Sequence, residues 1–206
     1  MALKIGEFLI GVFGSKYVAV LFVSMFPLIE LKGAIPIGMS EAFSMGLLET
    51  AAIAYIGSTV VSFALFFLLI PIFNLLKKIK FIEGLIKKIE NVFKGKAEKI
   101  ALKTQNSAED EAKRIMMLSL FLFVAVPFPI TGVWTGTAIA VFLGLKFRES
   151  VLPIALGNLV AGAVVTLLTY LFKGYVDYII YALFLIAIIM LVVFIIKIAK
   201  SKPEER

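Results

Sequence analysis

Cysteine and histidine are both absent from this chain of 206 residues. Their absence excludes disulfides, thiolate chemistry, haem-type ligation and imidazole-based zinc or proton-relay sites. Any group that titrates near neutral pH must therefore be a carboxylate or a lysine in a perturbed environment. The sequence also offers no nucleophile–base pair, metal-ligand cluster or pair of catalytic acids, so we expect no enzyme, no metal and no cofactor.

Charge is scarce as well, with 17% charged against 61% hydrophobic residues and a mean hydropathy of +1.04. Soluble domains are about half apolar, so this composition predicts an integral membrane protein with a single membrane domain. The formal net charge of +7 is typical of loops that face an anionic inner leaflet. Membrane lipids are therefore the expected partners, and no basic, aromatic-bearing soluble face favours nucleic acid.

Three uncharged segments, 50–76, 151–172 and 178–196, are each long enough to cross a bilayer, which takes about 20 helical residues. Two other apolar segments, 17–45 and 115–145, are interrupted by prolines and glycines. Because a proline in a helix interior costs about 3 kcal/mol or more, we interpret both as re-entrant hairpins that enter and leave on the same face. The alternative is a pair of kinked spanning helices.

The distribution of the 21 lysines and arginines favours the hairpin interpretation. Two hairpins put more of these residues on the cytoplasmic side than two spanning helices would, as the positive-inside rule expects. In that topology the linker at 77–107 and the C-terminus are cytoplasmic, and the N-terminus is outside. Apolar residues recur in the linker at steps of three and four between lysines, which predicts a basic amphipathic helix on the inner leaflet. The alternative is a soluble arm that docks a partner. Residues 1–16 are expected to form an interfacial helix.

The two halves of the chain echo each other at an offset near 100 residues. The matches include Pro27 with Pro127, Glu49 with Glu149, Gly57 with Gly157 and Ser58 with Asn158. Each half contains a hairpin, a short polar loop and a crossing helix, and one crossing separates the hairpins, so they must enter from opposite faces. We therefore predict an all-α polytopic membrane protein built as an inverted-topology repeat. The repeats are 17–76 and 108–172, and a last transmembrane helix with a basic tail occupies 173–206.

The first interrupted segment carries an acid and a base at membrane depth, where charges usually face a bundle interior or a wet cavity. Glu30 is the candidate coupling acid, because burial and the neighbouring Lys32 affect its proton affinity in opposite directions. Lys32 is the candidate anion contact or ion-pair partner. A static Glu30–Lys32 pair that pins the hairpin is the competing interpretation. Glu41 is either a second proton site or a residue of the outer headgroup layer.

Backbone opened by glycine and proline is expected to contact the substrate at both hairpin tips. In the second hairpin, hydroxyls and free amides would coordinate as dipoles, unless the threonines bond back to their own helix. The lone tryptophan would line a cavity or mark a shallower tip. The candidate tip residues are Gly33, Pro36, Gly38, Pro127, Pro129, Thr131, Gly132, Trp134, Thr135, Gly136 and Thr137.

The motifs ELKGAIPIG at 30–38 and PFPITGVWTG at 127–136 together resemble the signature of the small multidrug export protein family. The resemblance covers roughly residues 17–172 and implies a distant relation to the DedA (VTT-domain) membrane proteins. Those proteins are thought to carry two facing re-entrant hairpins and to act in proton-linked transport or in moving phospholipids and polyprenyl phosphates between leaflets. Lys32 stands where arginine is expected and Ile130 where glycine is expected, which argues against bidentate phosphate recognition and close backbone approach.

Three functional hypotheses follow. The first is a small proton- or ion-coupled transporter of the cell membrane, with a midplane site between the opposed hairpins. Its substrate would be a small molecule, an ion or a lipid phosphate. A homo-oligomer is a possible assembly. The second is a phospholipid or polyprenyl-phosphate translocase or scramblase in which Lys32 binds the phosphate and no ion gradient is needed. The third is a non-transporting membrane scaffold that docks a partner through the basic amphipathic helix.

Overall fold

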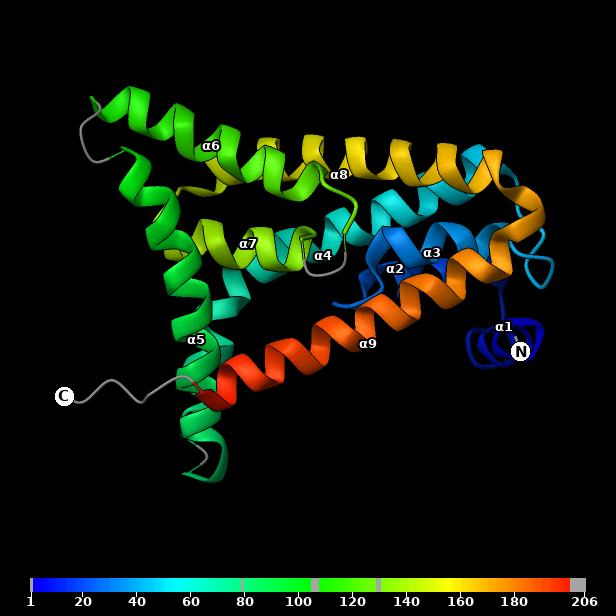
Figure 1. Cartoon of the computed structure of the whole chain (residues 1–206), viewed down its shortest axis with the longest axis horizontal. Helices are drawn as coiled ribbons and strands as arrows, with labels where there is room; N and C mark the ends of the chain where they lie inside the picture. The colour runs from blue at the N-terminus through cyan, green and yellow to red at the C-terminus, as the bar shows by residue number, and fades with distance from the viewer. Residues whose placement is uncertain (1, 79, 105–107, 129–130, 201–206) are drawn as a thin grey trace.

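The computed structural model describes residues 2–78, 80–104, 108–128 and 131–200, and the regular structure in these ranges is entirely helical. Long helices alternate with short ones along the chain (Figure 1). The long helices are α4 (Leu47–Leu76), α5 (Lys80–Ala101), α8 (Phe147–Leu171) and α9 (Val176–Lys200). The shorter ones are α1 (Ala2–Phe13), α2 (Lys16–Met25), α3 (Glu30–Met39), α6 (Glu109–Ala125) and α7 (Val133–Phe142), with 3-10 turns η1 (Leu102–Thr104) and η2 (Lys173–Tyr175).

Three helical stretches are long and apolar enough to cross a membrane: Leu47–Leu76, Phe147–Leu171 and Lys173–Val193. With 30 and 25 residues, α4 and α8 are about 45 and 38 Å long, which exceeds the ~30 Å of bilayer hydrocarbon. Many of their exposed side chains are large and apolar, as contact with lipid requires. The three predicted crossings are confirmed. A fourth crossing exists only if α1 and α2, bent by 100°, act as one span.

Each of the two interrupted segments forms two helices separated by a break. The helices α2, α3 and α7 have 10 residues each, or about 15 Å, roughly half the hydrocarbon thickness. The residues that follow α2 and α6 are Phe26 and Val126, with ψ of 134° and 120°. Both stand directly before a proline, which disfavours the helical conformation in the preceding residue. Pro27 and Pro127 thus explain why α2 and α6 end where they do.

The long helices α4 and α8 run antiparallel (Figure 1) and pack against each other where they cross. At the crossing the Asn158 amide donates to the Ser58 hydroxyl at 2.7 Å and to the Thr59 hydroxyl at 3.1 Å. The Tyr55 hydroxyl donates to the Ala155 carbonyl oxygen at 3.4 Å. Two of these three bonds join residues that lie 100 positions apart.

Small residues bring each long helix close to the helix that begins its own half. A Cβ on Gly57 would lie 2.6 Å from the Leu21 carbonyl oxygen, and one on Gly157 would lie 2.7 Å from the Phe121 carbonyl oxygen. Only glycine permits such an approach, so α4 packs tightly on α2 and α8 on α6. The two contacts are again related by a shift of 100 residues.

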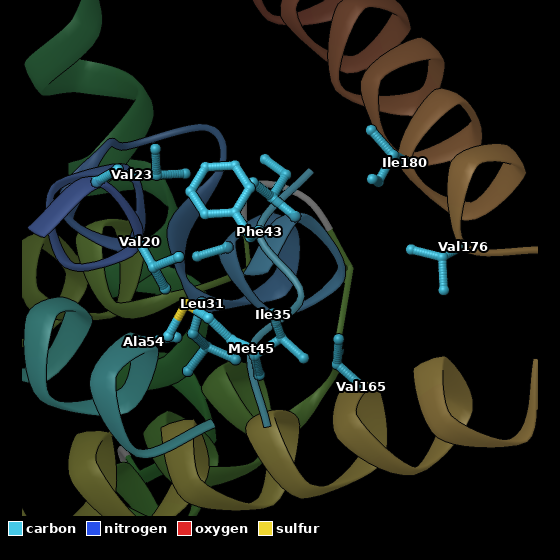
Figure 2. Packing of buried hydrophobic residues seen from close by; sticks show 13 residues of the cluster. Val20, Val23, Leu31, Ile35, Phe43, Met45, Ala54, Val165, Val176 and Ile180 are labelled. Atoms are coloured by element: carbon cyan, nitrogen blue, oxygen red, sulfur yellow. The ribbon is translucent and has the colours of Figure 1, made fainter. Parts of the chain in front are cut away.

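The hydrophobic core around α3 gathers side chains from five helices (Figure 2). Val20 from α2, Leu31 and Ile35 from α3, and Ala54 from α4 are almost completely buried there. Val165 from α8 and the α9 residues Val176 and Ile180 belong to the same cluster. α3 is therefore held on several sides, which fixes the residues at its N-terminus.

The amphipathic helix α5 lies across one end of the bundle, at a steep angle to α4 and α8 (Figure 1). Its apolar residues Ile86, Ile89 and Phe93 pack against Phe73 of α4 and Phe142 of α7. The bundle therefore covers the apolar face of α5, and a position of this helix on the inner leaflet stays a prediction.

Ion pairs fasten α5 to the end of α4. Glu90 pairs with Lys77, the residue after α4, and with Lys94 one turn further along α5. Partial burial alone would raise the pKa of Glu90, but the Lys77 hydrogen bond and the charges of both lysines outweigh burial and lower it. Glu90 is therefore ionised at neutral pH and holds α5 in place.

Candidate functional site

Glu30 is the first residue of α3 and lies at the break between α2 and α3. Its side chain points into the protein, and the residue is only 4% exposed. Its φ of +48° is a left-handed conformation that residues other than glycine rarely adopt. Such backbone strain persists only where the surrounding structure enforces it, and it is typical of functional sites.

Lys32 lies beside Glu30 and is equally buried. Its ammonium is 3.5 Å from one carboxylate oxygen of Glu30 and donates a 2.8 Å hydrogen bond to the Phe128 carbonyl oxygen. Phe128 lies in the break between α6 and α7, so Lys32 links the two halves of the chain. A buried ion pair needs such additional hydrogen bonds to offset the loss of solvation.

The Glu30 carboxylate faces the N-terminus of α7. Its other oxygen accepts a 3.2 Å hydrogen bond from the backbone N–H of Trp134, in the first turn of that helix. Unpaired N–H groups and the helix dipole favour a negative charge at this position. A Cβ on Gly132 would overlap the carboxylate, so only glycine leaves room for Glu30.

A fourth interaction closes the contact between the two breaks. The indole N–H of Trp134 donates to the Met25 carbonyl oxygen, at the end of α2, at 3.0 Å. The two breaks are therefore joined by three hydrogen bonds, two of them made by the members of the Glu30–Lys32 ion pair and the third by the Trp134 indole. All three side chains belong to residues that the sequence predicted for the site, as does Gly132. The structure thus brings Glu30 and Lys32 of the first half together with Gly132 and Trp134 of the second half, about 100 positions further along the chain.

The predicted opening of the backbone along 30–38 is wrong. The bend lies at 26–29, and Gly33, Pro36 and Gly38 are inside α3. Gly38 serves close packing, because a Cβ there would crowd Val20 at 3.1 Å and the hydroxyl of Thr50 at 3.3 Å. Gly33 belongs to the wall of a small cavity beside Glu30. A contact of these three residues with substrate stays a prediction.

The second motif divides between the break and α7. Pro127 and Thr131 lie in the break, where the Thr131 hydroxyl bonds the carbonyl oxygens of Val126 and Phe128, both at 2.8 Å. Thr135, Gly136 and Thr137 are buried in α7. Gly136 packs against Val124, Leu120 and Ile154. The Thr137 hydroxyl has no hydrogen-bond partner among the described residues. Pro129 and Ile130 lie outside the described residues.

Glu41 does not lie near Glu30 in the structure. It is exposed in the loop after α3, at the opposite end of that helix from Glu30. There it lines a hollow of about 440 Å³ together with Lys173, Asp177 and Tyr178. Glu41 is thus not part of the Glu30–Lys32 site, and its position at the end of the bundle agrees with a headgroup-level residue.

The contribution of α9 to this site was not predicted from the sequence. A cavity of about 30 Å³ adjoins the ion pair and is lined by Glu30, Lys32 and Gly33 with Leu28, Ile29, Leu183, Phe184 and Ala187. This volume holds about one or two water molecules. Leu183, Phe184 and Ala187 belong to an uncharged crossing helix that carries no local signal of a site. The two carbonyl acceptors, of Met25 and Phe128, were equally invisible, because every residue type has a carbonyl.

The sequence profile of the family described as Putative small multi-drug export protein matches residues 30–164. The chain belongs to this family. The matched range begins at Glu30 and contains both motifs, the ion pair, Gly132 and Asn158, whereas α9 lies beyond it. Searches of curated proteins and of solved structures gave no match. Membership of a family named for small multi-drug export, together with three apolar crossing helices, makes this a multi-pass membrane protein. A relation to DedA proteins stays a prediction.

Proposed function

We propose that this member of the small multi-drug export family is a proton-coupled transporter in which Glu30 is the coupling acid. The observation that carries the proposal is the position of the Glu30 carboxylate, which is buried between Lys32 and the N-terminus of α7. Buried ionisable groups within a membrane protein are costly, and they usually serve an ion or substrate pathway.

The proposed architecture is an inverted repeat of two re-entrant hairpins, α2–α3 and α6–α7. Helices of 10 residues are too short to span the hydrocarbon, which supports re-entry. Equivalent residues of two repeats can touch each other only near the axis that relates the repeats. The 100-residue contacts between Ser58 and Asn158 and between Tyr55 and Ala155 therefore support an axis through the α4–α8 crossing. Both breaks lie near the middle of the long axis (Figure 1), which supports a midplane site.

A proton on Glu30 would change the forces between the hairpins. A neutral carboxyl group loses its attraction to the Lys32 ammonium and to the N-terminus of α7. The contact with α7 joins the two breaks, and the Lys32 ammonium that donates to the Phe128 carbonyl oxygen is held in place by Glu30, so protonation would loosen the contact and let water or substrate reach the site. The present cavity holds only about one or two waters, which fits a closed state.

The other two hypotheses have less support. A lipid-phosphate translocase needs Lys32 to receive a phosphate, yet its ammonium already contacts Glu30 and the Phe128 carbonyl oxygen. A scaffold that docks a partner through α5 needs a free apolar face, yet Ile86, Ile89 and Phe93 pack on the bundle.

The proposal is tested in proteoliposomes by uptake of ethidium driven by an imposed pH gradient. We expect Glu30→Gln to abolish gradient-driven uptake, because a carboxamide cannot exchange a proton. Glu41→Gln is the matched control and should keep uptake near that of the unmodified protein, since Glu41 is exposed and distant from the ion pair. Uptake that survives Glu30→Gln unchanged would remove Glu30 as the coupling acid.

A further inference from the structure

The cavity beside the ion pair has one polar wall and otherwise apolar walls. Among the described residues that line it, Glu30 and Lys32 alone have polar side chains. Leu28, Ile29, Leu183, Phe184 and Ala187 supply the apolar walls, together with Gly33. A charged group beside an apolar slot matches a ligand that has a charged head and an apolar body.

The cavity meets the lipid-facing side of the bundle. Two of its lining residues, Leu28 and Phe184, are each 38% exposed, so they form a rim between the interior and the surrounding membrane. Neighbouring residues of α9 such as Leu185 and Ile188 are large, apolar and still more exposed. A ligand that passes this rim would come from the bilayer and not from an aqueous mouth.

The helix α9 is the least buried of the three apolar crossing stretches and packs against few other helices. It rests mainly on α3, with a lesser contact to α5 near its other end. Leu183, Phe184 and Ala187 line the cavity, whereas Ile180, one turn earlier, and Val176, two turns earlier, join the α3 core. An outward tilt about that anchored end would widen the cavity without disturbing the α4–α8 crossing.

The hydrogen bonds of the pair indicate which charge the ligand carries. The two contacts of the Glu30 carboxylate are 3.2 and 3.5 Å long, beyond the ~2.7–2.9 Å of a strong charge-assisted bond. A carboxylate accepts about four such bonds, so Glu30 has acceptor capacity to spare. Lys32 has no acceptor, and two of its three donors already face the Phe128 carbonyl oxygen and the Glu30 carboxylate. The carboxylate is the partner with room for a cation.

We propose that Glu30 binds the ammonium group of a cationic amphiphile that enters from the bilayer between Leu28 and Phe184, with α9 as the lid. The apolar body of the ligand then lies along Leu183 and Ala187. The inference deepens the proposed transport function and rests on it for its biological meaning, but binding is measured separately from flux.

Trp134 is the only tryptophan, and its backbone N–H contacts Glu30, so its fluorescence reports on this site. In lipid nanodiscs at constant pH we expect octylammonium to change the emission saturably, and octanesulfonate and octanol to have no saturable effect. Glu30→Gln should weaken the octylammonium response at least about tenfold, the loss expected when a hydrogen bond to a charged group is removed. An equal response to octanesulfonate or octanol would overturn the proposal.

A second measurement leaves the ion pair intact. Lipids with brominated acyl chains quench a tryptophan that the chains can approach, so we expect stronger quenching of Trp134 in Phe184→Ala than in the unmodified protein. Leu185→Ala is the matched control on the same helix, because Leu185 is 59% exposed and does not line the cavity. Equal quenching in both variants, or a gain in quenching by aqueous acrylamide alone, would show that the opening is not lateral.

The two proposals can fail independently. Saturable octylammonium binding without gradient-driven uptake would keep this ligand site and end the transport proposal. Proton-coupled uptake without octylammonium binding would keep the transport proposal and end this one.

Discussion

Gly132 is the residue whose missing side chain makes the ion-pair site possible. The space where its Cβ would lie is taken by the Glu30 carboxylate. Lys32 and Gly132 are also 100 positions apart, so the two halves of the chain differ in a complementary way. The first half carries the two charged residues, and the second half has a glycine at the equivalent position, which leaves space for the Glu30 carboxylate.

We expect Gly132→Ala to destabilise the protein by about 1–3 kcal/mol, as overpacking of a closed site does, and to abolish coupled uptake. Thermal unfolding in detergent and ethidium uptake measure the two effects. Gly95→Ala is the control, because nothing lies within 4 Å of that site in α5 and alanine favours a helix by up to ~1 kcal/mol. If the two variants unfold at the same temperature, the carboxylate does not occupy this space.

The coupling between Glu30 and Lys32 is measurable by a double-mutant cycle. Either Glu30→Gln or Lys32→Gln leaves one buried charge without its partner, which costs about 3–5 kcal/mol. The double variant leaves no charge, so we expect it to be more stable than the sum of the single losses by about 0.5–3 kcal/mol. The more exposed pair Glu83–Lys87 on α5 is the comparison, and its coupling should be no more than about 0.5 kcal/mol. Additive losses at Glu30 and Lys32 would mean that the pair is not formed.

At the scale of elements, the α4–α8 crossing holds the two halves together through one buried amide. Asn158 is 1% exposed and donates to both Ser58 and Thr59. Asn158→Ala should cost about 1–3 kcal/mol, because it leaves two buried hydroxyls without a donor. Ser150→Ala is the control in the same helix, since among the described residues the Ser150 hydroxyl bonds only the carbonyl oxygen of Lys146, the N-cap of that helix. Similar unfolding temperatures for the two variants would show that the amide does not join the helices.

The long helices could be predicted from sequence because an uncharged apolar run of sufficient length has one stable form in lipid. The breaks could be predicted because Pro27 and Pro127 force the preceding residues out of helical geometry. The helix at 30–38 could not, since Pro36 and two glycines argue against it locally. Burial of α3 among several helices outweighs that local preference.

The residues of the site could be predicted from the sequence only in part, and their arrangement in space could not. Glu30 and Lys32 stood out as charges in an apolar run, and Gly132 and Trp134 as part of a broken one. Their contact joins residues separated by 104 positions, and no local pattern encodes it. The α9 side chains at the cavity were beyond reach, because Leu183, Phe184 and Ala187 look the same as lipid-facing residues of a crossing helix.

At the scale of the whole molecule, the antiparallel arrangement of α4 and α8 puts the starts of the two helices at opposite ends of the bundle. Their first residues, Leu47 and Phe147, lie at opposite ends of the bundle, with α5 beside the start of α8 and α1 at the other end (Figure 1). We propose, from the basic residues of the linker, that the α5 end is cytoplasmic, which would put Glu41 and Lys173 on the outer side. A spanning bundle with the two hairpins opposed requires this separation.

The chain contains no cysteine, so single cysteines can test this separation without a background. Leu48→Cys and Arg148→Cys are 100 positions apart, both are exposed, and each lies in the first turn of its long helix. In sealed, right-side-out vesicles we expect a membrane-impermeant maleimide to label Leu48→Cys at once and Arg148→Cys only after the vesicles are opened. Labelling of both before opening would place the two helix starts on one side, which an antiparallel pair of crossing helices does not allow. The inverted repeat and the midplane site would then both be excluded.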